Sequence, residues 1–353
     1  MLKRQPDNAE AWLNLGVSLK ALGRTGESIE AYRRTLALQP DLPQGHNNLG
    51  LGLQQQGDHQ AAVAALEEAL RLKPDYARAH ANLAQSLLKL DRLAEAEAAA
   101  RRAIALAPGQ ADGHVNLGLV LMAQNRQEET VAVFRRVVSL QPDEPHSLSN
   151  LGVALKELGL LEEALRCQAE ARALDPDEAT PLWNEAHIRL LQGDFALGWE
   201  RYEARWGTGD FKSSLRPFKE PCWQGEALGH RALLLHVEQG VGDTVQFCRY
   251  LRLLAERHPA AEIVAEVQAS LAPLVAASFR DLPRLLVVPH ANKQGVNLPP
   301  FDLHAPLVAL PRLLGTRLDS VPAAVPYLEA PAPRRYRQEG DRLVVGISWK
   351  SIG

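Results

Sequence analysis

Residues able to move a proton surround a glycine-rich turn in the C-terminal part of the chain. The turn reads Glu-Gln-Gly-Val-Gly-Asp and sets Glu238 and Asp243 on either side of Gly240 and Gly242. A carboxylate at the start of a helix stays ionised because the helix dipole favours an anion, and once positioned it can accept a proton. Asp243 is therefore a carboxylate that its position would keep ionised and able to accept a proton. A structural turn and a plain helix cap fit the same pattern.

Alternating strands and helices are expected to position this turn. Apolar runs predict strands at 232–237, 261–267, 284–289 and 301–307, and helical segments follow the first, second and fourth. This alternation indicates a parallel, doubly wound α/β sheet that is Rossmann-like. Ligands of such sheets lie at the carboxyl ends of the strands, so Glu238, Asp243 and His304 should line one cleft. His236, inside the first strand, is expected in the core.

A second group of candidates is a column of asparagines in the N-terminal part. They recur every 34 residues, as Asn14, Asn48, Asn82, Asn116, Asn150 and Asn184. At about 100° per helical residue, Asn48 lies roughly 200° from His46 and the apolar stripe that His46 starts, so core packing does not require it. An amide donates and accepts at once, which suits the backbone of another polypeptide. Alternatively, the amide bonds a neighbouring helix and only sets the superhelical pitch.

The 34-residue interval recurs in further columns. Prolines stand at Pro6, Pro40, Pro74, Pro108, Pro142 and Pro176, and small residues at Gly16, Gly50, Ala84, Gly118, Gly152 and Ala186. Residues that tolerate a left-handed backbone fall between them, at Gly23, Gly57, Asp91, Asn125, Gly159 and Gly193. Each unit therefore predicts a helix hairpin ended by proline. One hairpin cannot bury its apolar face alone, so about six should stack as a solenoid over residues 1–206.

Histidines recur at the same interval. His46, His80 and His114 occupy the place of Trp12 in the packed stripe. Neighbouring repeats hold such residues about 8–10 Å apart, whereas zinc binds imidazole at about 2.1 Å. One ion cannot join them, and we expect a core role.

The repeat decays after Gly193. Trp199, Tyr202 and Trp206 follow helical spacing and predict an aromatic stripe that caps the solenoid or docks it onto the next domain. Residues 207–230 are rich in glycine and proline, which indicates an irregular connector.

These patterns resemble known families. The repeat is of the tetratricopeptide (TPR) type, and its asparagine column is similar to that of O-linked N-acetylglucosamine transferases, where asparagines hold an extended polypeptide backbone. The stretch LLLHVEQGVGDTVQFCRYL, with LPPFDLHAPLVALPRLLG and VPYL, resembles bacterial TPR proteins with a glycosyltransferase-like region. That region is similar to the amino-terminal half of heptosyltransferases, of the GT-B fold. The resemblance implies that Asp243 acts as general base on an acceptor hydroxyl and that a nucleotide sugar is the donor.

The resemblance also implies domain borders. Residues 231–340 would be the first GT-B half, and LVVGISW within 341–353 the first strand of the second half, which binds the donor in the family. The chain alone is therefore expected to be inactive and to hold no cofactor. At the other end, LKRQP matches the last turn of a second helix, so a preceding hairpin is expected to be missing.

Bulk composition narrows the function classes. The net charge of -3 lacks the basic excess of nucleic-acid binders, and three scattered cysteines give no zinc or disulfide framework. No segment has the pattern of a signal peptide or a membrane span, which fits the cytoplasm. We expect a protein or peptide partner in a concave TPR groove. The complete form would transfer a sugar from a nucleotide donor to a hydroxyl; the alternative is a non-catalytic TPR adaptor.

Overall fold

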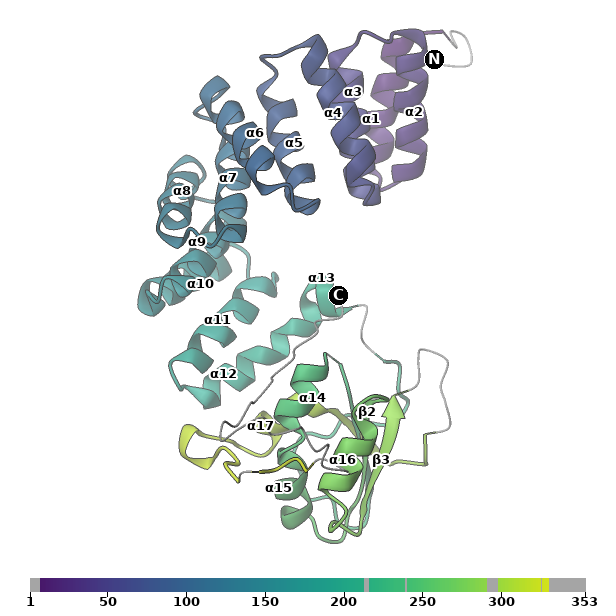
Figure 1. Cartoon of the computed structure of the whole chain (residues 1–353), viewed down its shortest axis with the longest axis vertical. Coiled ribbons are helices and arrows are strands. Elements are labelled where there is room, and N and C mark those ends of the chain that lie inside the picture. Colours follow the sequence, from purple (N-terminus) through teal and green to yellow (C-terminus); the bar gives the residue numbers. More distant parts are fainter. Residues whose placement is uncertain (1–6, 213–215, 239, 291–297, 325, 330–353) are drawn as a thin grey trace, which may run out of the picture. The chain divides into compact units, whose positions relative to one another are not determined.

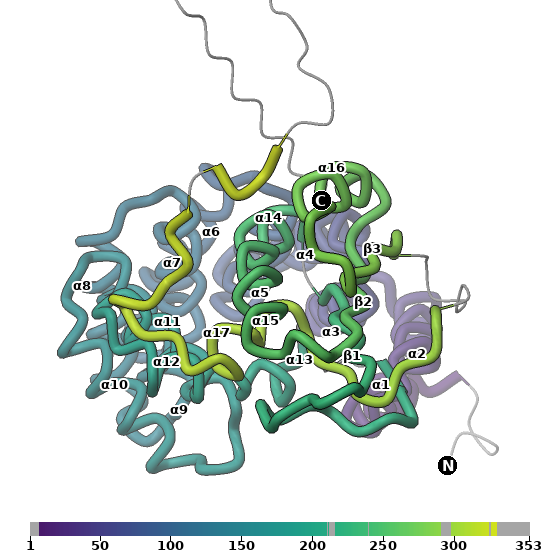
Figure 2. Tube along the Cα trace, turned by 90° about the horizontal axis from the view of Figure 1, so that it is seen from below, coloured from purple at the N-terminus to yellow at the C-terminus, as the bar shows by residue number. Residues whose placement is uncertain are grey.

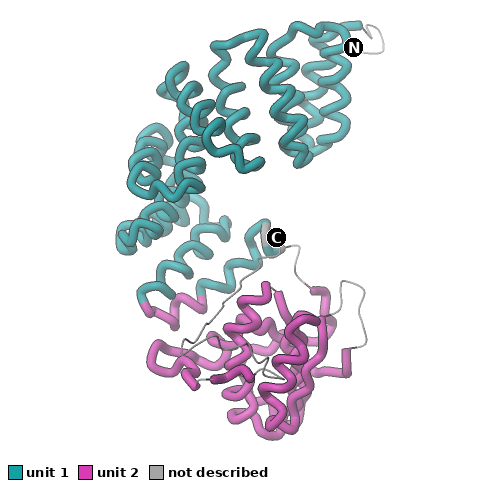
Figure 3. The backbone as a smooth tube through the Cα atoms, in the orientation of Figure 1, with its two compact units in different colours: residues 1–192, 201–212 teal, residues 193–200, 213–353 magenta. Residues whose placement is uncertain are grey.

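The computed structural model describes residues 7–212, 216–238, 240–290, 298–324 and 326–329. The chain forms two compact units, shown in different colours in Figure 3. The first comprises residues 1–192 and 201–212, and the second comprises residues 193–200 and 213–353. The partial repeat expected at residues 2–6 and the strand expected within 341–353 lie outside the described residues.

In the described part of the chain, helix hairpins follow one another from α1 to α12. The helices are α1 Ala9–Ala21, α2 Thr25–Leu38, α3 Pro43–Gln56, α4 His59–Leu72, α5 Ala77–Lys89, α6 Leu93–Leu106, α7 Ala111–Ala123, α8 Gln127–Leu140, α9 Pro145–Glu157, α10 Leu161–Leu174, α11 Thr180–Leu191 and α12 Phe195–Tyr202. Odd-numbered members are called first helices here, and even-numbered members second helices. Each second helix from α2 to α10 packs on the next first helix, as Figure 1 shows. The predicted TPR solenoid is confirmed.

Every hairpin turns at a residue with a left-handed backbone. Gly23 and Gly57 have φ angles of 72° and 89°, which cost glycine nothing. Asp91 and Asn125 hold φ angles of 59° and 57°, in the region that short polar side chains tolerate best. The helix breaks predicted from these residue types are confirmed.

Small residues let the two helices of a hairpin approach closely. A Cβ at Gly16 would lie 2.5 Å from the Tyr32 ring, and a Cβ at Gly118 would lie 2.7 Å from the Phe134 ring. Both rings are buried. The third hairpin has alanine instead of glycine, and there Ala100 takes the position of the ring. The close approach is therefore set by pairs of residues, one on each helix.

Aromatic rings close the end of the solenoid. The ring centroid of Trp183 on α11 lies 4.6 Å from that of Tyr202 and 5.3 Å from that of Phe211. Two short elements follow α12, η1 Glu203–Gly207 and α13 Gly209–Lys212. The expected aromatic stripe is divided, because Tyr202 belongs to the first unit whereas Trp199 packs on Phe247 within the second, at 5.7 Å between centroids.

The second unit contains a parallel sheet with the order β3-β2-β1-β4. The strands are β1 Ala232–His236, β2 Glu262–Gln268, β3 Leu285–His290 and β4 Leu303–Pro306; the helices are α14 Val241–Phe247, α15 Tyr250–Arg257, α16 Ala272–Ser278, η2 Leu307–Ala309, α17 Leu310–Leu313 and η3 Leu318–Ser320. Figures 1 and 2 place α14, α15 and α16 on one side of the sheet. The small parallel sheet predicted from the apolar runs is therefore present.

The helix expected to run to about residue 258 is interrupted. It consists of α14 and α15, joined by a turn at Cys248 and Arg249. The N–H of Leu251 bonds the Cys248 carbonyl only three residues back, at 3.0 Å, and Arg249 Nε donates to the Gln246 carbonyl at 3.0 Å. A bond of this shorter span tightens the helix locally and marks the break.

The connector is not irregular throughout. The N–H of Trp223 donates to the His304 carbonyl at 2.8 Å, and the His304 N–H donates to the Pro221 carbonyl at 3.1 Å. Both bonds lie along the outer edge of β4, so residues 221–223 cover that edge. The indole N–H of Trp223, a fully buried side chain, donates to the Glu226 carbonyl at 2.8 Å and holds the segment in place.

Candidate functional site

The asparagine column lies on the first helices. Asn14 is exposed, and the other five asparagines are half-buried. Asn82 Nδ2 donates to Asn47 Oδ1 at 2.8 Å, and Asn116 Nδ2 donates to the Ala81 carbonyl at 2.8 Å. These bonds join neighbouring first helices, which places the amides in one row along the solenoid.

The inter-repeat bonds leave part of each amide available. An amide has two N–H donors and an oxygen that accepts twice. One N–H of Asn82, Asn116 and Asn184 bonds the preceding hairpin, so a second N–H and Oδ1 remain for a ligand. Asn48 differs, because its Oδ1 accepts from Asn47 Nδ2 at 3.3 Å. The pitch-setting contact and the capacity to hold a peptide are therefore compatible in one side chain.

The recurring histidines differ from expectation. His46, His80 and His114 are half-buried rather than in the core. His46 Nε2 donates to the Pro40 carbonyl at 2.7 Å, and His80 Nε2 donates to the Pro74 carbonyl at 2.9 Å. Both prolines lie just beyond the end of a second helix, so each imidazole ties a first helix to the turn that precedes it.

Asp243 is the third residue of α14 and is half-buried. Its Oδ2 accepts from the Gly240 N–H at 3.1 Å, which is a capping contact. Burial raises the pKa of this carboxyl above its ordinary value. Gly240 has an ordinary φ of −71°, and a Cβ at Gly242 would meet nothing within 4 Å. The turn itself therefore does not require glycine at either position.

Glu238 and His304 lie at different levels of the sheet. Glu238 is half-buried and follows β1 by two residues; His304 lies in β4, in register with Leu234 of β1. Among the described residues, no hydrogen bond joins Asp243 to His304. That Glu238, Asp243 and His304 line one cleft therefore stays a prediction.

A polar cluster on one sheet face was not predicted. His236 Nε2 and His304 Nδ1 lie 3.3 Å apart, and the Phe218 ring packs on both imidazoles at 5.1 and 4.6 Å between centroids. Burial lowers the pKa of His304, which favours the neutral imidazole. His236, expected in the core, is indeed buried.

The same face carries a buried carboxylate. Glu266 on β2 is 2% exposed and forms an ion pair with Arg216 of the connector, and His290 Nδ1 lies 3.2 Å from its carboxylate. Arg216 and Glu266 are 50 residues apart in the sequence, so no local motif predicts that they pair. A buried charge requires such partners.

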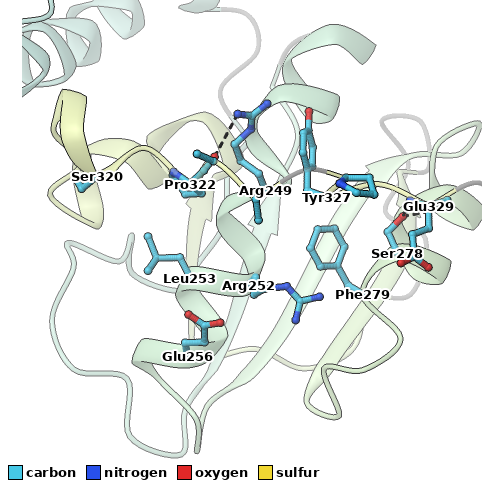
Figure 4. Close-up of a pocket in the computed structure, with 13 residues that line it drawn as sticks. Arg249, Arg252, Leu253, Glu256, Ser278, Phe279, Ser320, Pro322, Tyr327 and Glu329 are labelled. Carbon is cyan, nitrogen blue, oxygen red and sulfur yellow. Dashed lines mark hydrogen bonds between the residues drawn. The ribbon is translucent and has the colours of Figure 1, made fainter.

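A pocket of about 310 Å³ opens elsewhere in the second unit, between α15, the end of α16 and residues 320–329. Figure 4 shows Arg249 directed at the Pro322 carbonyl, which accepts from Nη1 at 3.3 Å, with the Tyr327 ring beside it. Arg252 forms an ion pair with Asp281 at 2.7 Å. None of the candidates Glu238, Asp243 and His304 lines this pocket.

The described residues were compared with the requirements of a membrane-spanning helix and of a metal site. Within them, no helix combines the length and apolar character needed to cross a bilayer. In the same part of the chain, no group of three or more His, Cys, Asp and Glu side chains is arranged to hold a metal ion.

Comparisons with known proteins agree with the first unit. Residues 7–75, 47–111, 83–145 and 115–179 match family profiles described as tetratricopeptide repeat. A structure of the APC/C hetero-tetramer Cut9–Hcn1 is similar over 59% of this chain and 42% of that chain, with 17% identity and a TM-score of 0.55. A thermophilic TPR protein of Thermus thermophilus is similar over 52% of this chain and 100% of its own, with 24% identity and a TM-score of 0.47. No curated protein matches the sequence.

Residues 7–179 are therefore tetratricopeptide repeats, and the first unit has the fold of a TPR protein-binding scaffold. The likeness to the Cut9–Hcn1 structure concerns the fold alone, since this chain spans 42% of that chain's length. TPR proteins bind proteins or peptides, and repeat solenoids of this kind present extended surfaces for such partners.

Proposed function

We propose that the first unit binds an extended segment of another polypeptide along the asparagine column. The observation that carries this proposal is the row of amides on neighbouring first helices, of which Asn82, Asn116 and Asn184 are tied to the preceding hairpin and retain hydrogen-bonding capacity. A fixed amide has lost its rotational freedom before the ligand arrives, so binding costs less conformational entropy.

The spacing of the row suits an extended chain. Packed helices lie about 8–10 Å apart, and a polyproline II chain rises about 3.1 Å per residue. One amide would then meet about every third residue of the ligand. An extended chain makes no internal hydrogen bonds, so its N–H and C=O groups are free for the amides. Recognition of this kind reads the backbone and depends little on side-chain sequence.

The test begins with unstructured peptides selected on the full chain from a random library, whose affinities are then measured by fluorescence anisotropy. A triple variant, Asn48→Ala with Asn82→Ala and Asn116→Ala, should weaken binding at least about tenfold, since each lost hydrogen bond contributes roughly 0.5–1.5 kcal/mol. Gln60→Ala, which removes an exposed amide from the second helix α4, is the control. Unchanged affinity of a folded triple variant would refute the proposal.

We also propose, as a second candidate, that the second unit is the acceptor half of a sugar-transferring site. Two observations favour it. The strand order turns back between β1 and β4, and ligands of parallel α/β sheets bind at such switch points. The raised pKa of half-buried Asp243 brings its carboxylate closer to the range that suits a general base at neutral pH.

Two substitutions of Asp243 distinguish a role as general base from a role as helix cap. Asp243→Asn can still accept from the Gly240 N–H but cannot take a proton, whereas Asp243→Ala loses both abilities. The assay uses a complete form that includes a donor-binding half. In that form a base role predicts that both variants lose sugar transfer from a panel of nucleotide sugars, by about 10²–10⁴-fold. Retained transfer in Asp243→Asn assigns the residue to capping alone. Absence of any calorimetric heat when nucleotide sugars are added to the complete form would favour a non-catalytic adaptor.

A further inference from the structure

A groove in the solenoid is lined by positive and apolar side chains. It lies between the second helices α6 and α8, with α7 beneath, and its volume is about 460 Å³. Its lining includes Arg101, Ile104, His114, Leu117, Val133 and Arg136, and no carboxylate. Asn116 lies two residues from His114, roughly 200° around α7. The groove is therefore distinct from the asparagine column.

The two groove arginines differ in their partners. Arg136 Nη1 donates to Ser139 Oγ at 3.3 Å, and Arg136 has no carboxylate partner among the described residues. Arg101 Nη2 pairs with Glu97 at 2.7 Å, but Arg126 also pairs with Glu97, at 2.9 Å. Arg126 has a second carboxylate partner in Glu129, at 2.7 Å, so the excess positive charge of the groove comes from Arg136.

This charge is particular to the middle of the solenoid. Between the other second helices, the pairs equivalent to Arg101 and Arg136 are Arg33 with Glu68, Glu67 with Arg102, and Arg135 with Glu170. Each of these pairs contains an acid. Among the adjacent pairs of the helices α2, α4, α6, α8 and α10, only α6 with α8 carries arginine at both positions.

We propose that this groove binds an acidic amphipathic helix of a partner protein. Each wall spans about one helical turn, residues 101–105 on α6 and 132–136 on α8, which leaves room for one large apolar anchor against Ile104, Leu117 and Val133. Carboxylates on either side of the anchor meet Arg101 and Arg136, whose guanidinium groups can form paired hydrogen bonds with them. Such an anchored helix is a common way for a groove to bind a peptide.

The experiment selects helical peptides from a display library on the full chain. Recovered peptides are measured against the wild type, Arg136→Glu, Ala132→Trp and Arg34→Glu. Ala132 lines the groove, and both it and Arg136 are exposed, so neither substitution touches the core. Arg34, exposed at the equivalent position of the first hairpin, is the matched control.

The proposal predicts peptides with one large apolar residue flanked by Asp or Glu within a turn. Their affinity should fall at least about tenfold for Arg136→Glu and for Ala132→Trp, and stay unchanged for Arg34→Glu. Recovered peptides without flanking acids, equal binding to all four chains, or no recovered peptide would overturn it. Binding of the wild type to phosphatidylglycerol vesicles, lost in Arg136→Glu while no acidic peptide is recovered, would assign the groove to a membrane surface instead.

Discussion

The side-chain amide of Asn184 donates a hydrogen bond to Ser149 Oγ at 2.9 Å, across 35 residues of sequence. The same offset recurs in the bonds made by Asn82 and Asn116. In each bond the accepting residue stands one position before the asparagine of an earlier hairpin. The asparagine column therefore connects successive hairpins through its own periodicity.

The hydrogen bond between Asn184 and Ser149 predicts that Ser149→Ala destabilises the chain more than Asn184→Ala. Ser149 Oγ also donates to Oε1 of Gln168, a side chain that is 1% exposed. Ser149→Ala leaves a buried acceptor less satisfied and should lower the free energy of unfolding by about 1–3 kcal/mol. Asn184→Ala, at a half-buried site, should lower it by about 0.5–1.5 kcal/mol. Urea denaturation measures both, and the reverse order would show that Gln168 finds another partner.

Helix approach in the fourth hairpin depends on Gly118. A Cβ there would lie 2.7 Å from Phe134, whose side chain is buried on all sides. Gly118→Ala should therefore destabilise the chain by about 1–3 kcal/mol, because the ring must leave its position. A Cβ at Gly26 on α2 would meet nothing within 4 Å, so Gly26→Ala should be neutral or stabilising. Thermal unfolding of the two variants compares them, and equal losses would contradict the packing argument.

The pH dependence of stability should include a contribution from Glu97. Hydrogen bonds from Arg101, opposed by burial and supported by Gln124 and Arg126, lower the pKa of its carboxyl to about 2. A lowered pKa means that the folded state favours the carboxylate, so this stability is present above the unfolded pKa and is lost as pH falls toward the folded pKa. Glu97→Gln should therefore destabilise the chain more at pH 7 than at pH 3.

Thermal unfolding at both pH values checks this prediction. Glu163→Gln, which removes an ion pair to Arg135 with more exposed side chains, is the matched control and should show a smaller difference. A Glu97→Gln effect of the same size at pH 7 and pH 3 would contradict the role assigned to the network.

The connector should be held on the sheet by Arg216. Its partner Glu266 is almost fully buried, and removal of one member of such a pair leaves an uncompensated charge. Arg216→Ala should lower the free energy of unfolding of the second unit by about 3–5 kcal/mol. Arg280→Ala, which removes an exposed ion pair to Glu329 at 4.0 Å, should cost less than about 1 kcal/mol. Similar costs in both variants would mean that Glu266 is solvated.

The repeat fold could be predicted because its signals are local. Proline, glycine and asparagine recur in phase, and residues such as Asp91 and Asn125 reveal the turns by their tolerance of a left-handed backbone. Periodicity does not tell which neighbour a polar group meets. The pattern predicts the imidazole of His46 in the core, yet it bonds the Pro40 carbonyl, because the turn between hairpins offers an acceptor that the pattern does not show.

The candidate site of the second unit was less predictable. The strands and the turn at Asp243 follow from apolar runs and glycines, but the partners of buried polar groups come from distant segments. Arg216 reaches Glu266 from the connector, and Phe218 packs on His304 in the same way. These pairs depend on how the connector crosses the sheet, which no spacing in the sequence specifies.

The measurement that tests the central claim most directly compares two variants of one hydrogen bond. Asn47→Ala removes the acceptor but keeps the amide of Asn82 in the column, whereas Asn82→Ala removes that amide. Affinity for a selected extended peptide should fall about three- to tenfold in Asn82→Ala and stay within about twofold of the wild type in Asn47→Ala. Equal losses in the two variants would contradict peptide recognition by the column and leave it only the role of setting the spacing between helices.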